Sequence, residues 1–197
     1  MKKEFEVISK IIQNNKRVLD IGCGDGTLME YLKKNQQNDV RGLEPQKNLV
    51  QKCISKGLSV IEGDAEKDLL QFPEKSFDYV VLSQTLQAFF KPEEVLNQLL
   101  RIGKQTIVSI PNFGHWKVRI HLLFKGTMPI TKNLPNEWYN TPNLHMCTIK
   151  DFVNFCNKKK IKIDKSMCLT NEKISEISNK NMNYKNIFSQ LGIFLIE

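Results

Sequence analysis

The sequence predicts an α/β fold, in which a mostly parallel β-sheet carries helices on both of its faces. Over the first two thirds of the 197 residues, short apolar runs alternate with amphipathic stretches of helical periodicity, which is typical of such sheets. One apolar run ends in a glycine-rich turn directly before a helical stretch, as in nucleotide-binding folds. The length and the 41% hydrophobic content predict a single domain with a sizeable core over residues 1–197.

Five apolar runs predict the parallel strands. Each run is short, rich in Val, Ile and Leu, and bounded by polar or glycine residues, as buried strands of parallel sheets are. The predicted strands are residues 17–22, 39–44, 58–64, 77–83 and 105–110.

Helical periodicity occupies intervals between these strands. Apolar residues from Phe5 to Ile12 share one face of an opening helix. A second helix is expected directly after the glycine turn and a third over residues 46–56. A fourth is expected from Pro92, because proline suits the first turn of a helix.

The C-terminal part of the chain has a less regular pattern. Residues 116–125 predict a helix, and a second helix begins at the capping residue Thr148. Residues 161–169 alternate as a strand does, and residues 192–197 predict a last apolar strand. The Asn- and Lys-rich segment 171–186 is expected to be a mobile surface loop.

Net charge is unevenly distributed along the chain. The formal charge is +8, and residues 1–110 carry 16 Lys and Arg against 15 Asp and Glu, whereas residues 111–197 carry 13 against 6. Such a basic region suits an anionic substrate, an acidic protein partner or nucleic acid, and equally a solvated lysine-rich surface. No zinc-finger, helix-turn-helix or RNA-binding signature accompanies it, so the charge does not by itself predict nucleic-acid binding.

The composition argues against several classes of protein. Five scattered cysteines without a CxxC pair, and only three histidines, predict neither a metal site nor a disulfide framework. No apolar run approaches the roughly 20 residues of a membrane span, and Glu4 and Glu6 interrupt any signal-like segment. The sequence therefore predicts a cytoplasmic protein with small buried thiols.

The most informative motif is the stretch VLDIGCGDG, residues 18–26. Its glycines permit a tight turn and let a ligand approach the backbone closely. Thr27 stands where dinucleotide-binding enzymes carry a third glycine, so the turn does not indicate a pyrophosphate. The residues expected to surround a ligand here are Asp20, Gly22, Cys23, Gly24 and Gly26.

Acidic residues close three successive predicted strands. Asp20 places a carboxylate beside the glycine turn, which disfavours a phosphate but suits a ligand with an ammonium and a sulfonium group. Glu44 lies 20 residues after Gly24, where an acidic side chain can bind both ribose hydroxyls. Asp64 and the backbone N–H of Ala65 can bind the edge of an adenine. Together these residues predict S-adenosylmethionine, rather than NAD, as the cofactor.

Each acid also has an ordinary structural interpretation. Asp20 can serve as a turn or helix-cap residue, Glu44 before Pro45 as a solvated strand end, and Asp64 as the cap of the next helix. Their joint placement at consecutive strand ends favours the cofactor site.

The glycine turn and the three acids resemble those of the class I S-adenosylmethionine-dependent methyltransferases. The resemblance implies a Rossmann-like, seven-stranded sheet of order 3-2-1-4-5-7-6, whose antiparallel last strand lies between the fifth and sixth. It also implies that Asp20 orients the methionine end of the cofactor and that the product is S-adenosylhomocysteine. The other cofactor contacts that it implies are Glu44 and Pro45 at the ribose, Asp64 and Ala65 at the adenine, and Ser83 and Gln84 at the methionine moiety.

A narrower resemblance covers residues 17–155. The blocks RVLDIGCGDGTL, SFDYVVLSQTLQAF, IVSIPNFGHWKVRIHLLFKGTMPIT and LPNEWYNTPNLHMCTIKDF are similar to those of the methionine biosynthesis protein MetW family. One departure is Gln46, where the family more often carries a second acid after the ribose-binding Glu44. The resemblance implies a role in methionine synthesis, either as a methyltransferase or as a non-catalytic partner and activator of a homoserine O-acyltransferase.

The segment 111–147 follows the fifth strand at the edge of the sheet where ligands bind, so it is expected to form a lid and an acceptor pocket. Methyl transfer depends mainly on orientation and on exclusion of water. A base is needed only for a protonated acceptor; the three histidines, His115, His121 and His145, are the candidates, and His115 is the one expected to serve. Core packing is an equal alternative for the tryptophans. The expected pocket residues are Asn112, His115, Trp116, Trp138, Tyr139, Thr141 and His145.

A nucleic-acid methyltransferase is a third functional alternative, and only the positive charge favours it. The Asp/Asn-Pro-Pro-aromatic signature that many base methyltransferases carry after the fourth strand is absent, because LSQTLQAF stands there.

Overall fold

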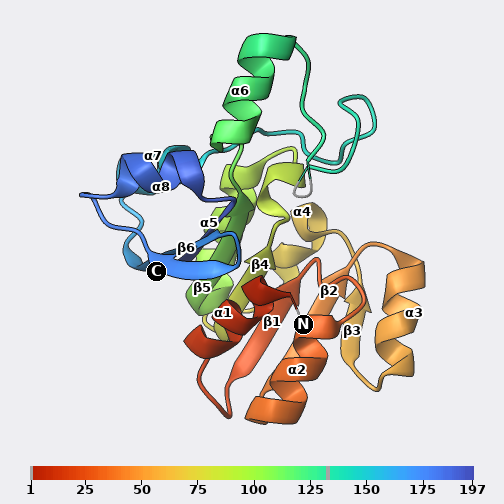
Figure 1. Cartoon of the computed structure of the whole chain (residues 1–197). Coiled ribbons are helices and arrows are strands. Elements are labelled where there is room, and N and C mark those ends of the chain that lie inside the picture. Colours follow the sequence, from red (N-terminus) through yellow and green to blue (C-terminus); the bar gives the residue numbers. More distant parts are fainter. Residues whose placement is uncertain (1, 132–133) are drawn as a thin grey trace.

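The computed structural model describes residues 2–131 and 134–197 and is built on one eight-stranded sheet (Figure 1). Its strands are β1 (Arg17–Ile21), β2 (Asp39–Glu44), β3 (Ser59–Glu62), β4 (Phe77–Ser83), β5 (Gly103–Pro111), β6 (Ile163–Thr170), β7 (Lys173–Glu176) and β8 (Leu191–Ile196). They are ordered β3-β2-β1-β4-β5-β8-β6-β7. Strands β1 to β5 pair in parallel, whereas β8 is antiparallel to both β5 and β6.

The predicted α/β fold and the insertion of the last strand between the fifth and sixth are confirmed. The prediction of seven strands is wrong, because β7 forms an eighth by pairing antiparallel with β6. The expectation of a loop over 171–186 is also wrong, since this segment contains β7 and most of the helix α8 (Met182–Phe188). β7 is four residues long with a mostly polar sequence, so its pairing is decided by the backbone of β6 rather than by apolar periodicity.

Helices cover both faces of the sheet. Alternate residues of β4 point to opposite faces, as the pleat requires: Tyr79 and Val81 belong to one apolar cluster, Val80 and Leu82 to the other. The first cluster is covered by α1 (Lys3–Ile11), α2 (Thr27–Gln36) and α3 (Lys47–Ser55). The second is covered by α4 (Ala65–Asp68), α5 (Pro92–Ile102) and α7 (Ile149–Lys159). Two 3-10 turns, η1 (Leu69–Gln71) and η2 (Leu86–Ala88), lie between β3 and α5.

Local sequence signals explain where the C-terminal helices begin. Thr148 caps α7 as predicted, and it forms a reciprocal capping box with Asp151. The predicted helix over 116–125 is confirmed as α6 (Trp116–Lys125), which projects away from the sheet (Figure 1). Within the described residues, none of the helices has the length and hydropathy needed to cross a membrane.

Candidate functional site

The glycine turn after β1 has the backbone conformation that its glycines predict. Gly22, Gly24 and Gly26 have φ values of 67°, 59° and 75°, which residues other than glycine rarely adopt. A methyl group on Gly26 would lie 2.5 Å from Leu58, whereas one on Gly24 would meet no atom within 4 Å. Gly26 is thus required for packing, and the turn has open space beside Gly24.

Glu44 connects this turn to the next helix. Its Oε2 accepts a hydrogen bond of 2.9 Å from the backbone N–H of Gly24, and its Oε1 accepts one of 3.1 Å from Gln46. The residue is only 4% exposed, so it is not the solvated strand end that was the alternative interpretation. Each carboxylate oxygen can accept a further hydrogen bond, which leaves capacity for ligand hydroxyls.

Asp20 is a buried carboxyl group on the neighbouring strand. Burial, followed by the negative charges of Glu4 and Glu44, raises the pKa of Asp20 to about 8. No hydrogen bond to its carboxylate is present among the residues that the structure describes. A buried carboxyl group without a partner is costly, and a cationic ligand group placed beside it would relieve that cost.

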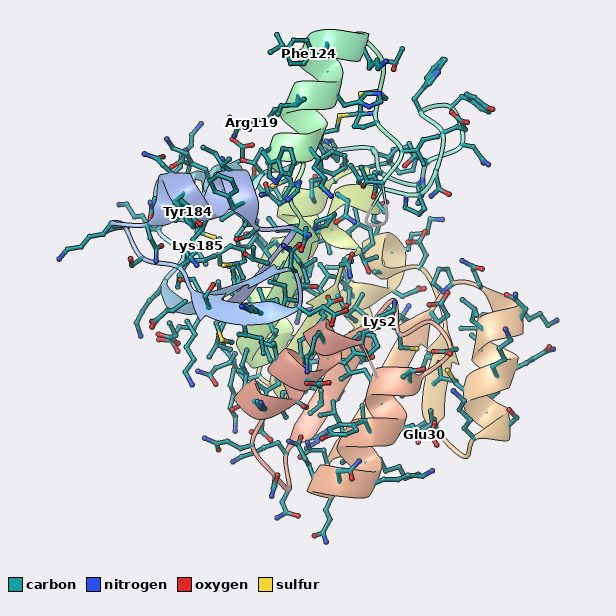
Figure 2. All side chains as sticks on the ribbon, viewed as in Figure 1. Lys2, Glu30, Arg119, Phe124, Tyr184 and Lys185 are labelled. Atoms are coloured by element: carbon teal, nitrogen blue, oxygen red, sulfur yellow. The ribbon has the colours of Figure 1, made fainter. Side chains whose placement is uncertain are left out.

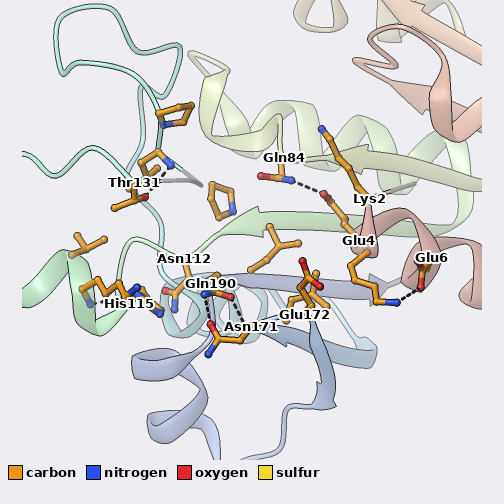
Figure 3. A pocket seen from close by; sticks show the side chains of 18 residues that line it. Lys2, Glu4, Glu6, Gln84, Asn112, His115, Thr131, Asn171, Glu172 and Gln190 are labelled. Carbon is orange, nitrogen blue, oxygen red and sulfur yellow. Dashed lines mark hydrogen bonds and ion pairs between the residues drawn. The ribbon is translucent and has the colours of Figure 1, made fainter.

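Glu4, on α1, is a site residue that the sequence analysis missed. It is 3% exposed, and its carboxylate accepts hydrogen bonds from the side chains of Ser83, Gln84 and Ser109, at the ends of β4 and β5. Figure 3 shows the contact with Gln84. The available signal was its position on the buried face of the opening helix, four residues before Ile8. The first helix therefore contributes an acid to the predicted methionine end of the site.

The backbone at Gln84 is held in an unusual conformation. Its φ of 50° lies in the left-handed region, where residues other than glycine are uncommon. The backbone N–H of Gln84 donates to both the carbonyl and the hydroxyl oxygen of Ser109, each at 3.0 Å. Such a conformation is typical of functional sites in which the surrounding contacts compensate for the strain.

Asp64 has a more exposed environment than the other two acids. Its carboxylate caps α4 by accepting from the backbone N–H of Glu66, and it pairs with Lys67 at 3.0 Å. The hydrogen bond from Lys67 is the main cause that lowers the pKa of Asp64. The Asp64 side chain is 42% exposed, and Ala65 is buried, so only Asp64 of this pair presents its side chain to a ligand.

A cavity of about 1030 Å³ lies beside Glu4 and Gln84 (Figure 3). It is bordered by the start of α1, the end of β5, the first turn of α6 and the turn that connects β6 to β7. Of the predicted acceptor residues it contains Asn112 and His115. A second cavity of about 710 Å³, on the α5 and α7 side, contains His145.

Asn112 and His115 both have structural roles at the border of the first cavity. The Asn112 amide donates to the backbone of Asn186 and Ser189, and its Oδ1 accepts from Gly114 and Ile149. These four hydrogen bonds of the Asn112 side chain fix the loop after β5.

The His115 ring caps α6, because its Nδ1 accepts from the backbone N–H of Lys117 at 3.3 Å. Burial lowers the pKa of His115, the charge of Lys117 lowers it further, and a hydrogen bond to the backbone of Phe188 opposes both. The Nδ1 atom of the ring is therefore already engaged by the backbone of α6.

The remaining predicted acceptor residues lie apart from both cavities. Trp138 and Tyr139 pack edge to face against each other with centroids 5.7 Å apart, and they are 69% and 72% exposed. Thr141 accepts from the backbone N–H of Asn143, and Trp116 is 39% exposed at the start of α6. The structure thus gathers the predicted cofactor residues at one edge of the sheet but does not gather the predicted acceptor residues.

Comparison of the sequence with known protein families identifies the family of this chain. The model of the family described as methionine biosynthesis protein MetW matches residues 2–196. The chain belongs to the MetW family. A curated relative, the bifunctional methionine biosynthesis protein MetXA/MetW of Rhodopirellula baltica, is 34% identical over 175 residues, which cover 82% of this chain but 27% of the relative. A demethylmenaquinone methyltransferase of Listeria welshimeri is 28% identical over 60% of this chain and 56% of its own length.

Two solved structures with the same fold are described as S-adenosylmethionine-dependent methyltransferases. One from Thermotoga maritima, described as a possible histamine N-methyltransferase, has a TM-score of 0.69 and 17% identity, over 98% of this MetW-family chain and 87% of its own. Another from Mesorhizobium loti has a TM-score of 0.69 and 14% identity, over 99% and 97%. At such identities the likeness shows the fold.

Proposed function

We propose that this MetW-family domain binds S-adenosylmethionine beside the glycine turn and acts as a methyltransferase in methionine biosynthesis. The observation that carries the proposal is the buried carboxyl group of Asp20, which has no hydrogen-bond partner among the described residues and lies next to a turn that is open at Gly24. The cofactor brings an ammonium and a sulfonium group, and an opposite charge favours the ionised form of a buried acid.

Each side chain of the edge has a distinct binding task in this proposal. Glu44 holds the turn with its backbone contacts and uses its remaining acceptor capacity for the ribose hydroxyls. The partly exposed carboxylate of Asp64, at the start of α4, binds the edge of the adenine. Glu4 fixes the Ser83 and Gln84 side chains beside the methionine end. When bound, the cofactor supplies a methyl group activated by its sulfonium.

The cavity beside Glu4 and Gln84 is the proposed acceptor site. It adjoins the methionine end through these two residues, so a bound acceptor would lie next to the transferred methyl group. Its charged border includes Lys2, Lys3 and Glu172 and therefore suits a small polar acceptor better than an apolar one. The proposal requires no proton transfer to His115, whose Nδ1 already accepts a hydrogen bond from the backbone.

Calorimetry with S-adenosylmethionine and S-adenosylhomocysteine tests the proposal. The wild-type protein should bind both, and Asp20→Asn should weaken S-adenosylmethionine binding by about tenfold or more, because a charge-assisted contact is lost. Asp39→Asn is the matched control, since Asp39 is an exposed acid at the opposite end of the adjacent strand. Absence of binding by the folded wild type would overturn the proposal.

A second proposed function is activation of a homoserine O-acyltransferase by a physical complex. One observation favours it: the Rhodopirellula baltica relative bears the names of both proteins, MetXA and MetW, on one chain. Joining two units in one chain keeps them at a high effective concentration, as a working complex requires. The test is the acyltransferase activity of the purified partner with and without this protein; unchanged activity together with absence of binding would contradict it.

A further inference from the structure

Helix α6 exposes an apolar stripe on the face directed away from the protein. Trp116, Ile120, Leu123 and Phe124 are spaced as i, i+4, i+7 and i+8, which places them on one side of a helix. Their exposed fractions are 39%, 45%, 76% and 76%. Val118, on the opposite side, is buried and anchors the helix to the body. The helix projects from the sheet, and Phe124 lies near its outer end (Figure 2).

Such a stripe differs from ordinary exposed apolar residues. Single apolar side chains on a surface are common and need no explanation, but contiguous apolar patches mark sites of interaction. The i, i+4, i+7, i+8 pattern is the arrangement by which one helix fills an apolar groove of another protein. The stripe is also presented on three turns of helix, so its side chains are already ordered for binding.

The charges around the stripe define the chemistry of its partner. Lys117 and Arg119 flank it, and the α6 sequence contains no acidic residue. Figure 2 shows Arg119 on the lower part of the helix, away from the Phe124 end. A complementary surface is therefore an apolar groove with an acidic border, because opposite potentials guide association and fix register.

We infer that α6 is the docking helix for the acyltransferase subunit, and that its stripe occupies an apolar groove with acidic borders on that enzyme. The inference rests on the second proposed function and names the surface of that complex. The relative with both units on one chain favours a folded protein, rather than a bilayer or a second copy, as the occupant. A partner docked here lies beside the acceptor cavity, because His115 both caps α6 and lines that cavity.

The test uses the double substitution Leu123→Asp and Phe124→Asp in the full chain. Both side chains are exposed, so the variant should fold, with an unchanged Tm and unchanged affinity for S-adenosylmethionine. Its affinity for the purified homoserine O-acyltransferase from the same genome should fall by about 30-fold or more, as expected for buried interface anchors. Leu70→Asp is the matched control, because Leu70 is 72% exposed but lies in η1.

The possible results separate the docking surface from the partner. Equal acyltransferase binding by the wild type and the double variant would overturn the assignment of α6 while the partner proposal stands. If the wild type does not bind the acyltransferase, both fail, although binding of S-adenosylmethionine can still be measured. Two further results would overturn the inference. In one, the wild type binds phosphatidylglycerol vesicles and the double variant does not. In the other, the wild type is a dimer by light scattering and the double variant is a monomer.

Discussion

The backbone N–H of Gly24 donates a hydrogen bond of 2.9 Å to the Glu44 carboxylate, which joins the glycine turn after β1 to the end of β2. The acid proposed to bind ribose therefore also holds the turn that is proposed to contact the cofactor. In this proposal, the fold and ligand binding depend on the same side chain.

Glu44→Ala should reduce both stability and S-adenosylmethionine affinity. Two backbone N–H groups lose a charged acceptor, which costs about 3 kcal/mol of unfolding free energy, and the proposed ribose contact is lost as well. Urea unfolding and calorimetry measure the two effects. Glu62→Ala is the control, since Glu62 lies on β3 directly opposite Glu44 of β2 but is exposed. A Glu44→Ala variant with wild-type affinity would refute the ribose assignment.

Stability should fall as the pH rises, because of Asp20. Its folded pKa of about 8 lies above the ordinary aspartate value of 3.8, so the folded state binds the proton more tightly. This contribution to the unfolding free energy is complete below pH 3.8 and is lost as the pH rises toward 8. In Asp20→Asn the decline between pH 5 and pH 8 should be smaller in urea unfolding. An identical decline in wild type and variant would contradict the raised pKa.

The same group predicts how cofactor affinity varies with pH. A cationic ligand favours ionised Asp20, so S-adenosylmethionine binding should release a proton, and its affinity should rise by up to about tenfold between pH 6 and pH 7. Calorimetry in buffers of different ionisation enthalpy measures the proton release directly. Persistence of the full pH dependence in Asp20→Asn would show that another group is responsible.

Glu4→Ala tests whether the first helix is part of the site. The substitution removes the acceptor of Ser83, Gln84 and the buried Ser109 hydroxyl, so the unfolding free energy should fall by about 2 kcal/mol. The affinity for S-adenosylmethionine should fall as well, because Ser83 and Gln84 lose their fixed positions. Glu6→Ala, on the same helix but paired with Lys3 at the surface, should leave both quantities unchanged. Equal effects of the two substitutions would contradict the role of Glu4.

Gly26→Ala and Gly57→Ala separate packing from backbone conformation. Both glycines have positive φ values, 75° and 69°, but only at Gly26 would the new methyl group meet other atoms, Leu58 and Cys53. Gly57→Ala should cost about 1 kcal/mol from backbone strain, and Gly26→Ala about 2–4 kcal/mol, since overpacking is added. The midpoints of thermal unfolding compare them, and equal midpoints would show that packing around Gly26 adjusts freely.

The sequence indicated for a physical reason that the candidate cofactor acids lie at one edge of the sheet. Strands buried on both faces are continuous apolar runs, and each polar residue that ends such a run lies at the same edge of a parallel sheet. Asp20, Glu44 and Asp64 were therefore placed together by strand counting alone. The local alternatives could be decided only by the structure: burial excludes a solvated Glu44, and a hydrogen bond from the backbone N–H of Glu66 shows that Asp64 caps α4.

The acceptor region was predicted less well, because its residues depend on tertiary contacts. Exposed Leu123 and Phe124 have the same periodicity as core residues, so the sequence alone does not reveal that α6 projects from the sheet. Glu4 is separated from Ser83 by 79 residues and from Ser109 by 105 residues, and no local pattern indicates these contacts. The polar strand β7 is likewise defined by backbone pairing with β6.

The position of β8 between β5 and β6 has a consequence for biosynthesis. Residues 191–196 are translated after all other strands, yet they supply the only backbone pairing of β5 on that side and the link to β6 among the described residues. Until they leave the ribosome, the nascent chain has an open apolar β5 edge, and such edges pair readily with other chains. A premature stop before Leu191 should therefore give chains that aggregate during translation, whereas chains that include β8 can close their own sheet.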